Sequence, residues 1–125
     1  MIKNRILAWF DENESELKRE IVEITADLVA QKTVNPGKEQ LGAYDYLEVS
    51  GQESLAADAT AKWLDKWGID YVIHEGAPMR GNIIAALGQG KPELMLGLHT
   101  DVVPPGDGWD SDPFKLLERD GLLIG

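Results

Sequence analysis

The sequence contains no cysteine. This absence excludes a disulfide scaffold, a zinc site with cysteine ligands and catalysis by a thiol. The chain also has no apolar run near the ~20 residues that span a bilayer. Its opening residues, MIKNRILAWFDENE, lack the small-residue cleavage pattern of a signal peptide. We therefore expect neither a membrane protein nor a secreted protein, and the default location is cytoplasmic.

Basic residues are few relative to acidic residues. Twelve Lys and Arg stand against 22 Asp and Glu, which gives a formal net charge of -10 at pH 7. An acidic surface repels phosphate backbones, so we expect no nucleic-acid partner. The glycine-rich stretch GQGKPE lacks the spacing and the following helix of a phosphate-binding loop. The length of 125 residues and the hydrophobic fraction of 43% fit one folded domain.

An amphipathic helix is predicted over residues 14–31, where apolar side chains recur at spacings of four, three and four. Its start is open: either Asn13 caps it, or the helix runs back through Ile6 and Phe10. An Asn-Pro-Gly sequence at residues 35–37 stops it, because proline restricts the residue before it. The apolar positions are Leu17, Ile21, Ile24 and Leu28.

A second helix is predicted to end at Gly68, and the sequence SGQE at residues 50–53 fits a capping box at its start. Its apolar positions repeat every four residues, so Trp63 and Trp67 are expected in the core. Residues 36–50 have no clear period and are predicted to form a loop, of which residues 38–50 are a solvated connector. The repeating positions are Leu55, Ala59, Trp63 and Trp67.

Five short strands are predicted in the second half of the chain. The strand at 94–98 is apolar on both faces apart from Gly97, so we expect it inside a covered sheet. The last two strands meet at a turn, Asp120-Gly121. Helices followed by strands around a buried strand predict an α/β layer architecture. The predicted strands are 69–73, 82–87, 94–98, 115–118 and 122–124.

The buried strand is followed at once by His99 and, two residues later, by Asp101. Ligand sites in α/β proteins gather at the carboxyl ends of strands. If the strand continues, both side chains point to the same face, since side chains alternate with a period of two. A carboxylate can then fix the tautomer of the imidazole and leave the other ring nitrogen free for a metal ion or a proton. The other histidine, His74, has no such acid and is predicted to lie on the surface.

The stretch HTDVVPPGDGWDSDPF, followed by the hairpin ERDGLLIG, closely resembles one enzyme family. It is the family of dizinc amidohydrolases and exopeptidases that includes acetylornithine deacetylase, succinyl-diaminopimelate desuccinylase, aminoacylase and glutamate carboxypeptidase. The family motif is His-x-Asp-x-Val-Pro, then Gly-Asp-x-Trp, then Pro-Phe. The matching positions are His99, Asp101, Val103, Pro104, Gly106, Asp107, Trp109, Pro113 and Phe114.

The resemblance implies a zinc-exopeptidase-like three-layer sandwich, with two helices and then a mixed sheet, of which this chain holds an incomplete N-terminal portion. It implies that His99 is a zinc ligand and that Asp101 is the catalytic carboxylate that orients it. Two Zn²⁺ ions, with Co²⁺ as a plausible substitute, would serve hydrolysis of an amide bond in an N-acyl amino acid or a small peptide. A homodimer is implied for the full-length protein. Trp109 and Phe114 are interpreted as anchors that pin the loop after the motif.

None of the family's later motifs matches a residue of this sequence. Residues 1–125 therefore look like the N-terminal part of a metallohydrolase catalytic domain, without the later metal motifs or the dimerisation domain. We expect no turnover from this chain alone, and association through an exposed sheet edge. Two alternatives stay open. One is a non-catalytic binding or assembly module, and the other is a mononuclear metal site using His99 and Asp101 with Asp107 or Asp112.

Overall fold

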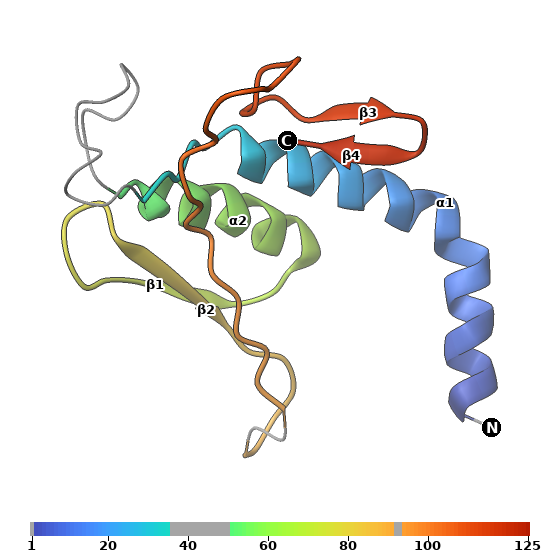
Figure 1. The fold of residues 1–125 in the computed structure, drawn as a ribbon. Coiled ribbons are helices and arrows are strands. Elements are labelled where there is room, and N and C mark those ends of the chain that lie inside the picture. Colours follow the sequence, from blue (N-terminus) through green and yellow to red (C-terminus); the bar gives the residue numbers. More distant parts are fainter. Residues whose placement is uncertain (1, 36–50, 92–93) are drawn as a thin grey trace.

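A computed structural model of the chain describes residues 2–35, 51–91 and 94–125. Two helices are followed by two antiparallel hairpins, and the described residues between the hairpins form no helix or named strand (Figure 1). The predicted loop and connector at 36–50, and Ser50 of the predicted capping box, lie outside the described residues. The elements are α1 Ile2–Val29, α2 Glu53–Trp67, β1 Tyr71–Glu75, β2 Gly81–Ala85, β3 Leu117–Arg119 and β4 Leu122–Ile124.

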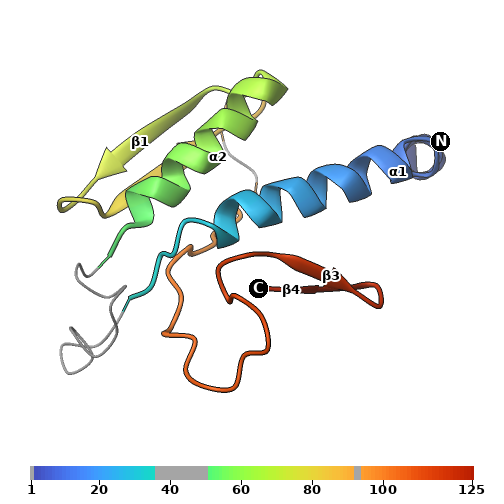
Figure 2. The same cartoon turned by 90° about the horizontal axis from the view of Figure 1, so that it is seen from above.

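The elements are arranged in the spatial order of hairpin, helix, helix and hairpin. The β1–β2 hairpin lies against α2, α1 lies on the other side of α2, and the β3–β4 hairpin lies beyond α1 (Figures 1 and 2). The apolar face of an amphipathic helix needs a cover, and here α2 is covered by α1 on one side and by the β1–β2 hairpin on another. The core of the described residues accordingly follows α2, which buries Ala56, Ala57, Ala59, Ala61, Trp63 and Leu64.

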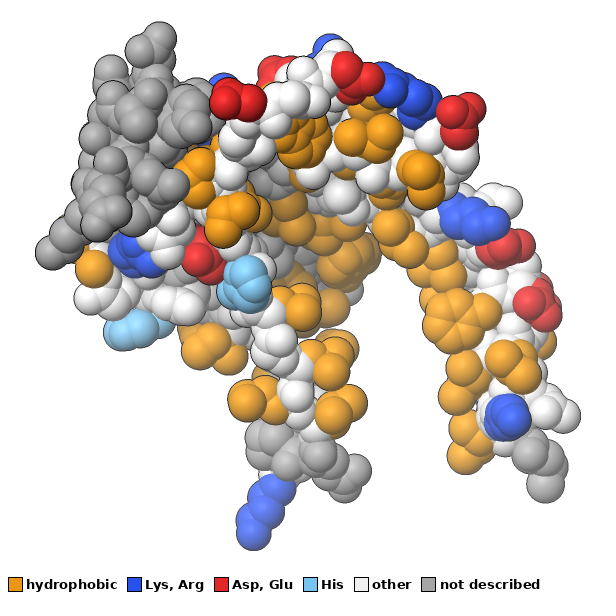
Figure 3. Space-filling model, in the orientation of Figure 1, with side chains coloured by type: hydrophobic (Ala, Val, Ile, Leu, Met, Phe, Trp, Pro, Cys, Tyr) orange, Lys and Arg blue, Asp and Glu red, His pale blue; other side chains and the backbone are white. Residues whose placement is uncertain are grey.

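The first helix takes the longer of the two predicted courses and begins at Ile2. Its apolar stripe therefore continues through Ile6 and Phe10, but about half of each of these side chains is exposed. Figure 3 shows this apolar stripe on the free N-terminal half of α1. No helix of the described residues is long and apolar enough to cross a membrane.

The second helix ends at Gly68 as predicted, with this residue in the left-handed conformation at φ 66°. Only glycine adopts that conformation without strain from a Cβ, which makes it the common helix terminator. Trp63 is buried as predicted, at 7% exposed, whereas the prediction for Trp67 is wrong because 44% of it is exposed. Both lie on one helical stripe, but Trp67 belongs to the last turn, where its neighbours Asp65 and Lys66 are exposed as well.

The β1–β2 hairpin pairs Tyr71 with Ala85 at one end and Glu75 with Gly81 at the other. Its strands begin and end within two residues of the predicted bounds. Gly81 allows the hairpin to approach the start of α2 closely, because a Cβ at this position would lie 2.8 Å from the Oγ atom of Ser54. The hairpin therefore packs on α2 through a contact that a larger residue would block.

The prediction of a buried strand at 94–98 is wrong for the described residues. Residues 94–98 form no strand and pair with no described strand, and Leu94 and Leu98 are 78% and 96% exposed. The described strands form two separate two-stranded antiparallel sheets rather than one mixed sheet. An apolar run indicates that a strand is suited to burial, but burial also needs neighbours on both sides, and these residues supply none.

The β3–β4 hairpin is confirmed, with β3 beginning two residues later than predicted. Asp120 and Gly121 form its turn with φ values of 53° and 76°. Two successive positive φ values define the tight turn that matches the twist of antiparallel strands, which explains the Asp-Gly sequence.

Candidate metal site at His99 and Asp101

The backbone that carries the candidate site is held by a short parallel pairing with the segment after α1. The amide of Val102 donates to the carbonyl oxygen of Thr33 at 2.9 Å, and the amide of Asn35 donates to that of Val102 at 2.8 Å. The hydroxyl of Thr33 donates to the carbonyl oxygen of Thr100. Thr33 and Val34 are both buried. The segment after His99 is therefore fixed to residues 33–35, which follow α1, although residues 94–98 before it have no such support.

The ring of His99 is oriented by Asp101. The Nδ1 atom lies 3.1 Å from the carboxylate Oδ1 atom of Asp101 and 3.0 Å from the backbone oxygen of the same residue. Both oxygens can only accept a hydrogen bond, so the proton of the neutral ring belongs on Nδ1. The lone pair is then on Nε2, in a side chain that is 84% exposed. A neutral imidazole with a free Nε2 is a metal ligand or a proton acceptor.

Asp101 has a second partner, which the sequence analysis missed. The side-chain amide of Asn35 donates to the Oδ2 atom of Asp101 at 3.1 Å. This hydrogen bond, more than the nearby His99, holds the pKa of the Asp101 carboxyl below its usual value, although partial burial acts in the opposite direction. Asp101 is therefore an anion at neutral pH, and in this form its carboxylate accepts a hydrogen bond from Nδ1 of His99. The sequence analysis interpreted Asn35 as part of a helix stop and did not predict its contact with Asp101.

A cavity of about 410 Å³ lies beside His99, between the end of α1 and the loop that follows the motif. Its walls are mainly apolar, with Leu28 and Phe114 among them, and Lys32 adds a positive charge. The loop is pinned by Trp109, whose indole Nε1 atom donates to the carbonyl oxygen of Pro105 at 2.9 Å. The ammonium group of Lys32 lies 5.3 Å from the centre of the Phe114 ring. The structure thus confirms Trp109 as an anchor of the loop.

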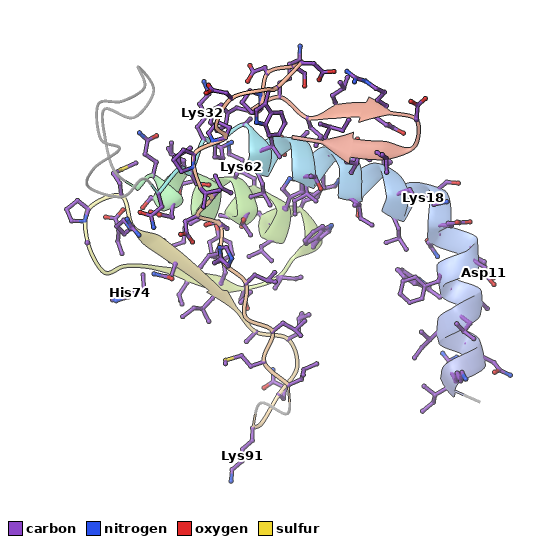
Figure 4. All side chains as sticks on the ribbon, viewed as in Figure 1. Asp11, Lys18, Lys32, Lys62, His74 and Lys91 are labelled. Atoms are coloured by element: carbon purple, nitrogen blue, oxygen red, sulfur yellow. The ribbon has the colours of Figure 1, made fainter. Side chains whose placement is uncertain are left out.

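Figure 4 shows Lys32 near this loop and His74 on the outer edge of the β1–β2 hairpin, away from it. His74 is exposed, as predicted.

The described residues fit one part of a metal site and not a complete one. His99 offers a correctly prepared ring nitrogen, but no three His, Cys, Asp or Glu side chains of the described residues gather where they could hold an ion. The described residues therefore give no support to the alternative of a mononuclear site with Asp107 or Asp112. Asp112 instead closes a turn, because its carboxylate accepts the backbone amide of Phe114 at 2.9 Å.

Two helices, two small antiparallel sheets and a His-Asp pair beside a cavity define an α/β protein with an incomplete ligand site. No family model and no solved structure matches the chain. Curated proteins do match it.

A succinyl-diaminopimelate desuccinylase of Zymomonas mobilis is 35% identical over 108 residues, which cover 83% of this chain and 25% of that protein. An acetylornithine deacetylase of Pasteurella multocida is 41% identical over 68 residues, covering 52% of this chain and 18% of that protein. A succinyl-diaminopimelate desuccinylase of Bordetella pertussis is 56% identical over 46 residues, covering 35% and 12%.

The chain belongs to the family of succinyl-diaminopimelate desuccinylase and acetylornithine deacetylase, as the motif around His99 predicts. It spans about a quarter, or less, of the length of the curated relatives it matches.

Proposed function

We propose that this chain supplies part of the active site of a zinc-dependent enzyme that hydrolyses the amide bond of an N-acyl amino acid or a small peptide. The observation that carries the proposal is the His99 ring, whose Nδ1 atom is held by Asp101 while its Nε2 atom is left free. Family membership supports it, because the relatives are named as a desuccinylase and a deacetylase, which remove acyl groups.

In this proposal His99 binds zinc through Nε2, and Asp101 keeps the ring in the tautomer that can do so. A carboxylate in this position also makes the imidazole a stronger donor toward a cation, because its negative charge stabilises the positive charge that develops on the ring. Zinc held by His99 would supply Lewis-acid chemistry for amide hydrolysis, and Co²⁺ is a plausible substitute.

We further propose that the other zinc ligands, a second zinc ion and the general base come from parts of the protein that this chain does not span. The described residues offer no group of three ligands, and the relatives extend well beyond the matched quarter. The same extension would complete the three-layer sandwich, cover residues 94–98 and provide the homodimer contact. The chain by itself would show no turnover and weak zinc affinity, and the whole protein would work in the cytoplasm.

A second candidate function is a non-catalytic binding or assembly module. It is favoured by one observation, the exposed apolar segment at residues 94–98, which offers unpaired backbone groups to another strand. This candidate leaves the orientation of His99 by Asp101 without a use.

A chimera tests the proposed function. The matched region of the Zymomonas desuccinylase would be replaced by the corresponding residues of this chain, and zinc-dependent desuccinylation would be measured. We expect activity that is lost with His99→Ala and retained with His74→Ala, the matched control at the other histidine. A folded, zinc-loaded chimera without activity, or one that is equally active with His99→Ala, would contradict the proposal.

A further inference from the structure

Asn35 is separated from Asp101 by 66 positions in the sequence, yet its side-chain amide lies 3.1 Å from the Asp101 carboxylate. The two carboxylate oxygens therefore have different partners: Oδ1 faces His99, and Oδ2 faces Asn35. A carboxylate held at one oxygen can still turn about its last side-chain bond, which has a broad torsional preference. A second hydrogen bond at the other oxygen fixes its plane.

The backbone around Asn35 makes this second hydrogen bond dependable. The backbone amide of Asn35 donates a hydrogen bond to the carbonyl oxygen of Val102, and Val34 forms a parallel β-bridge with the same residue. Val34 is 3% exposed and Val102 is 48% exposed, so the bridge is buried on the side of Val34. The side chain of Asn35 is thus presented to Asp101 from a fixed backbone position, and its carboxamide group donates a hydrogen bond to the carboxylate.

We propose that Asn35 is a positioning residue of the site. Its carboxamide holds the Asp101 carboxylate in the orientation that accepts the Nδ1 proton of His99, and so keeps the Nε2 lone pair available to a ligand. The inference rests on the proposed function only for the identity of the ligand at Nε2. The two hydrogen bonds that join Asn35 to Asp101 and Asp101 to His99 lie entirely within the described residues.

The backbone oxygen of Asp101 also faces Nδ1, at 3.0 Å. Loss of Asn35 would therefore weaken the preference for the proton on Nδ1 without abolishing it. The expected change is the effect of one hydrogen bond, about a two- to tenfold fall in the ratio of the two neutral tautomers of His99.

The test is nitrogen-15 NMR of the two imidazole rings in the metal-free chain, at a pH where both rings are neutral. The chain has two histidines, and His74 is exposed on β1, so it reports the ratio of an unassisted ring in the same spectrum. We expect Asn35→Ala and the similarly sized Asn35→Leu to shift the ratio at His99 toward that of His74. The control is Asn82→Ala, at an exposed asparagine paired with His74, which should leave His99 unchanged.

Asp101→Ala serves as the reference variant. It removes the carboxylate itself and so shows how far the tautomer ratio of His99 shifts when that hydrogen bond is absent. An unchanged His99 ratio in both Asn35 variants, with a clear shift in Asp101→Ala, would overturn the inference. Loss of the hydrogen bond from Val102 to Thr33 in both variants, seen in the Val102 amide signal, would also overturn it by making Asn35 a backbone-structural residue. An inactive chimera would refute the proposed function and leave this result standing.

Discussion

The hydrogen bond between Trp63 and Asp27 joins the two helices and is the best place to perturb the fold. The indole Nε1 atom of Trp63 donates to the Oδ2 atom of Asp27 at 2.8 Å, and the Trp63 side chain is nearly buried. A hydrogen bond to a charged group contributes about 1.5–3 kcal/mol, and the lower half of that range fits a bond that is only partly shielded from water. We expect Asp27→Ala to lower the free energy of unfolding by about 2 kcal/mol.

The assay is urea unfolding followed by circular dichroism, in a double-mutant cycle of Asp27→Ala and Trp63→Phe. Each single change and the pair are compared, so that the coupling energy isolates the hydrogen bond from the loss of indole packing. Asp11→Ala is the matched control, because Asp11 is an exposed carboxylate on the free half of the same helix (Figure 4). A coupling energy near zero, or an equal loss from Asp11→Ala, would refute the assignment of this bond as a stabilising link between α1 and α2.

Three further predictions concern other contacts. The ammonium group of Lys66 lies 2.9 Å from the Glu20 carboxylate and lowers the pKa of that carboxyl. Its stabilisation is therefore fully present above the ordinary glutamate pKa and is lost as pH falls through the lowered value. The urea midpoints of wild type and Glu20→Gln should differ at pH 7 and converge as the pH falls below the lowered pKa of Glu20.

Arg80→Met should lower the free energy of unfolding by about 2 kcal/mol, because Glu53, which is 8% exposed, loses its partner at 3.1 Å. Adding Glu53→Gln should recover part of this loss, and no recovery would contradict the pairing. Leu96→Lys should reduce concentration-dependent association in sedimentation experiments, since a charge blocks strand addition, and a wild-type chain that stays monomeric would contradict it.

Elements encoded by local spacing could be predicted from the sequence. Both helices and the last hairpin depend on signals within a few residues, such as the left-handed Gly68 and the Asp120-Gly121 turn. The extent of α1 was left open, because Ile6 continues the apolar period but no local signal says whether a neighbour covers it. Partial exposure of that end does not prevent the helix from forming.

The exposure of residues 94–98 could not be predicted from the sequence. Their apolar pattern shows that the segment is suited to burial, but it does not show whether neighbouring strands are present to bury it. The prediction that Trp67 is buried was wrong for the same reason. Helical spacing places Trp67 on the apolar stripe, but it does not show whether another segment covers the last turn of α2. In both cases the sequence period was read correctly, and the missing information was which other segment lies opposite.

The two contacts of Asp101 in the candidate site differ in the same way: one depends on local sequence spacing, and the other depends on a distant segment. The approach of His99 to Asp101 follows from a spacing of two residues, so a local pattern predicted it. The approach of Asn35 to Asp101 depends on the pairing of distant segments. The proline that follows Asn35 was a usable signal, because it favours an extended backbone that can pair with another segment, and not only the end of a helix.

The candidate site is thus held by hydrogen bonds on one side of His99 and exposed to solvent on the other. Residues 33–35 and 100–102 fix the backbone and the carboxylate behind His99, whereas residues 94–98 in front of it are exposed. The tautomer of the exposed His99 ring depends on the two oxygens of Asp101 that face Nδ1, and on Asn35, which holds the carboxylate. Metal affinity requires several ligands in addition, which the described residues do not gather. The chain alone should therefore show the tautomer preference of His99 at full strength while binding zinc weakly, and a segment that adds ligands should raise zinc affinity without changing that preference.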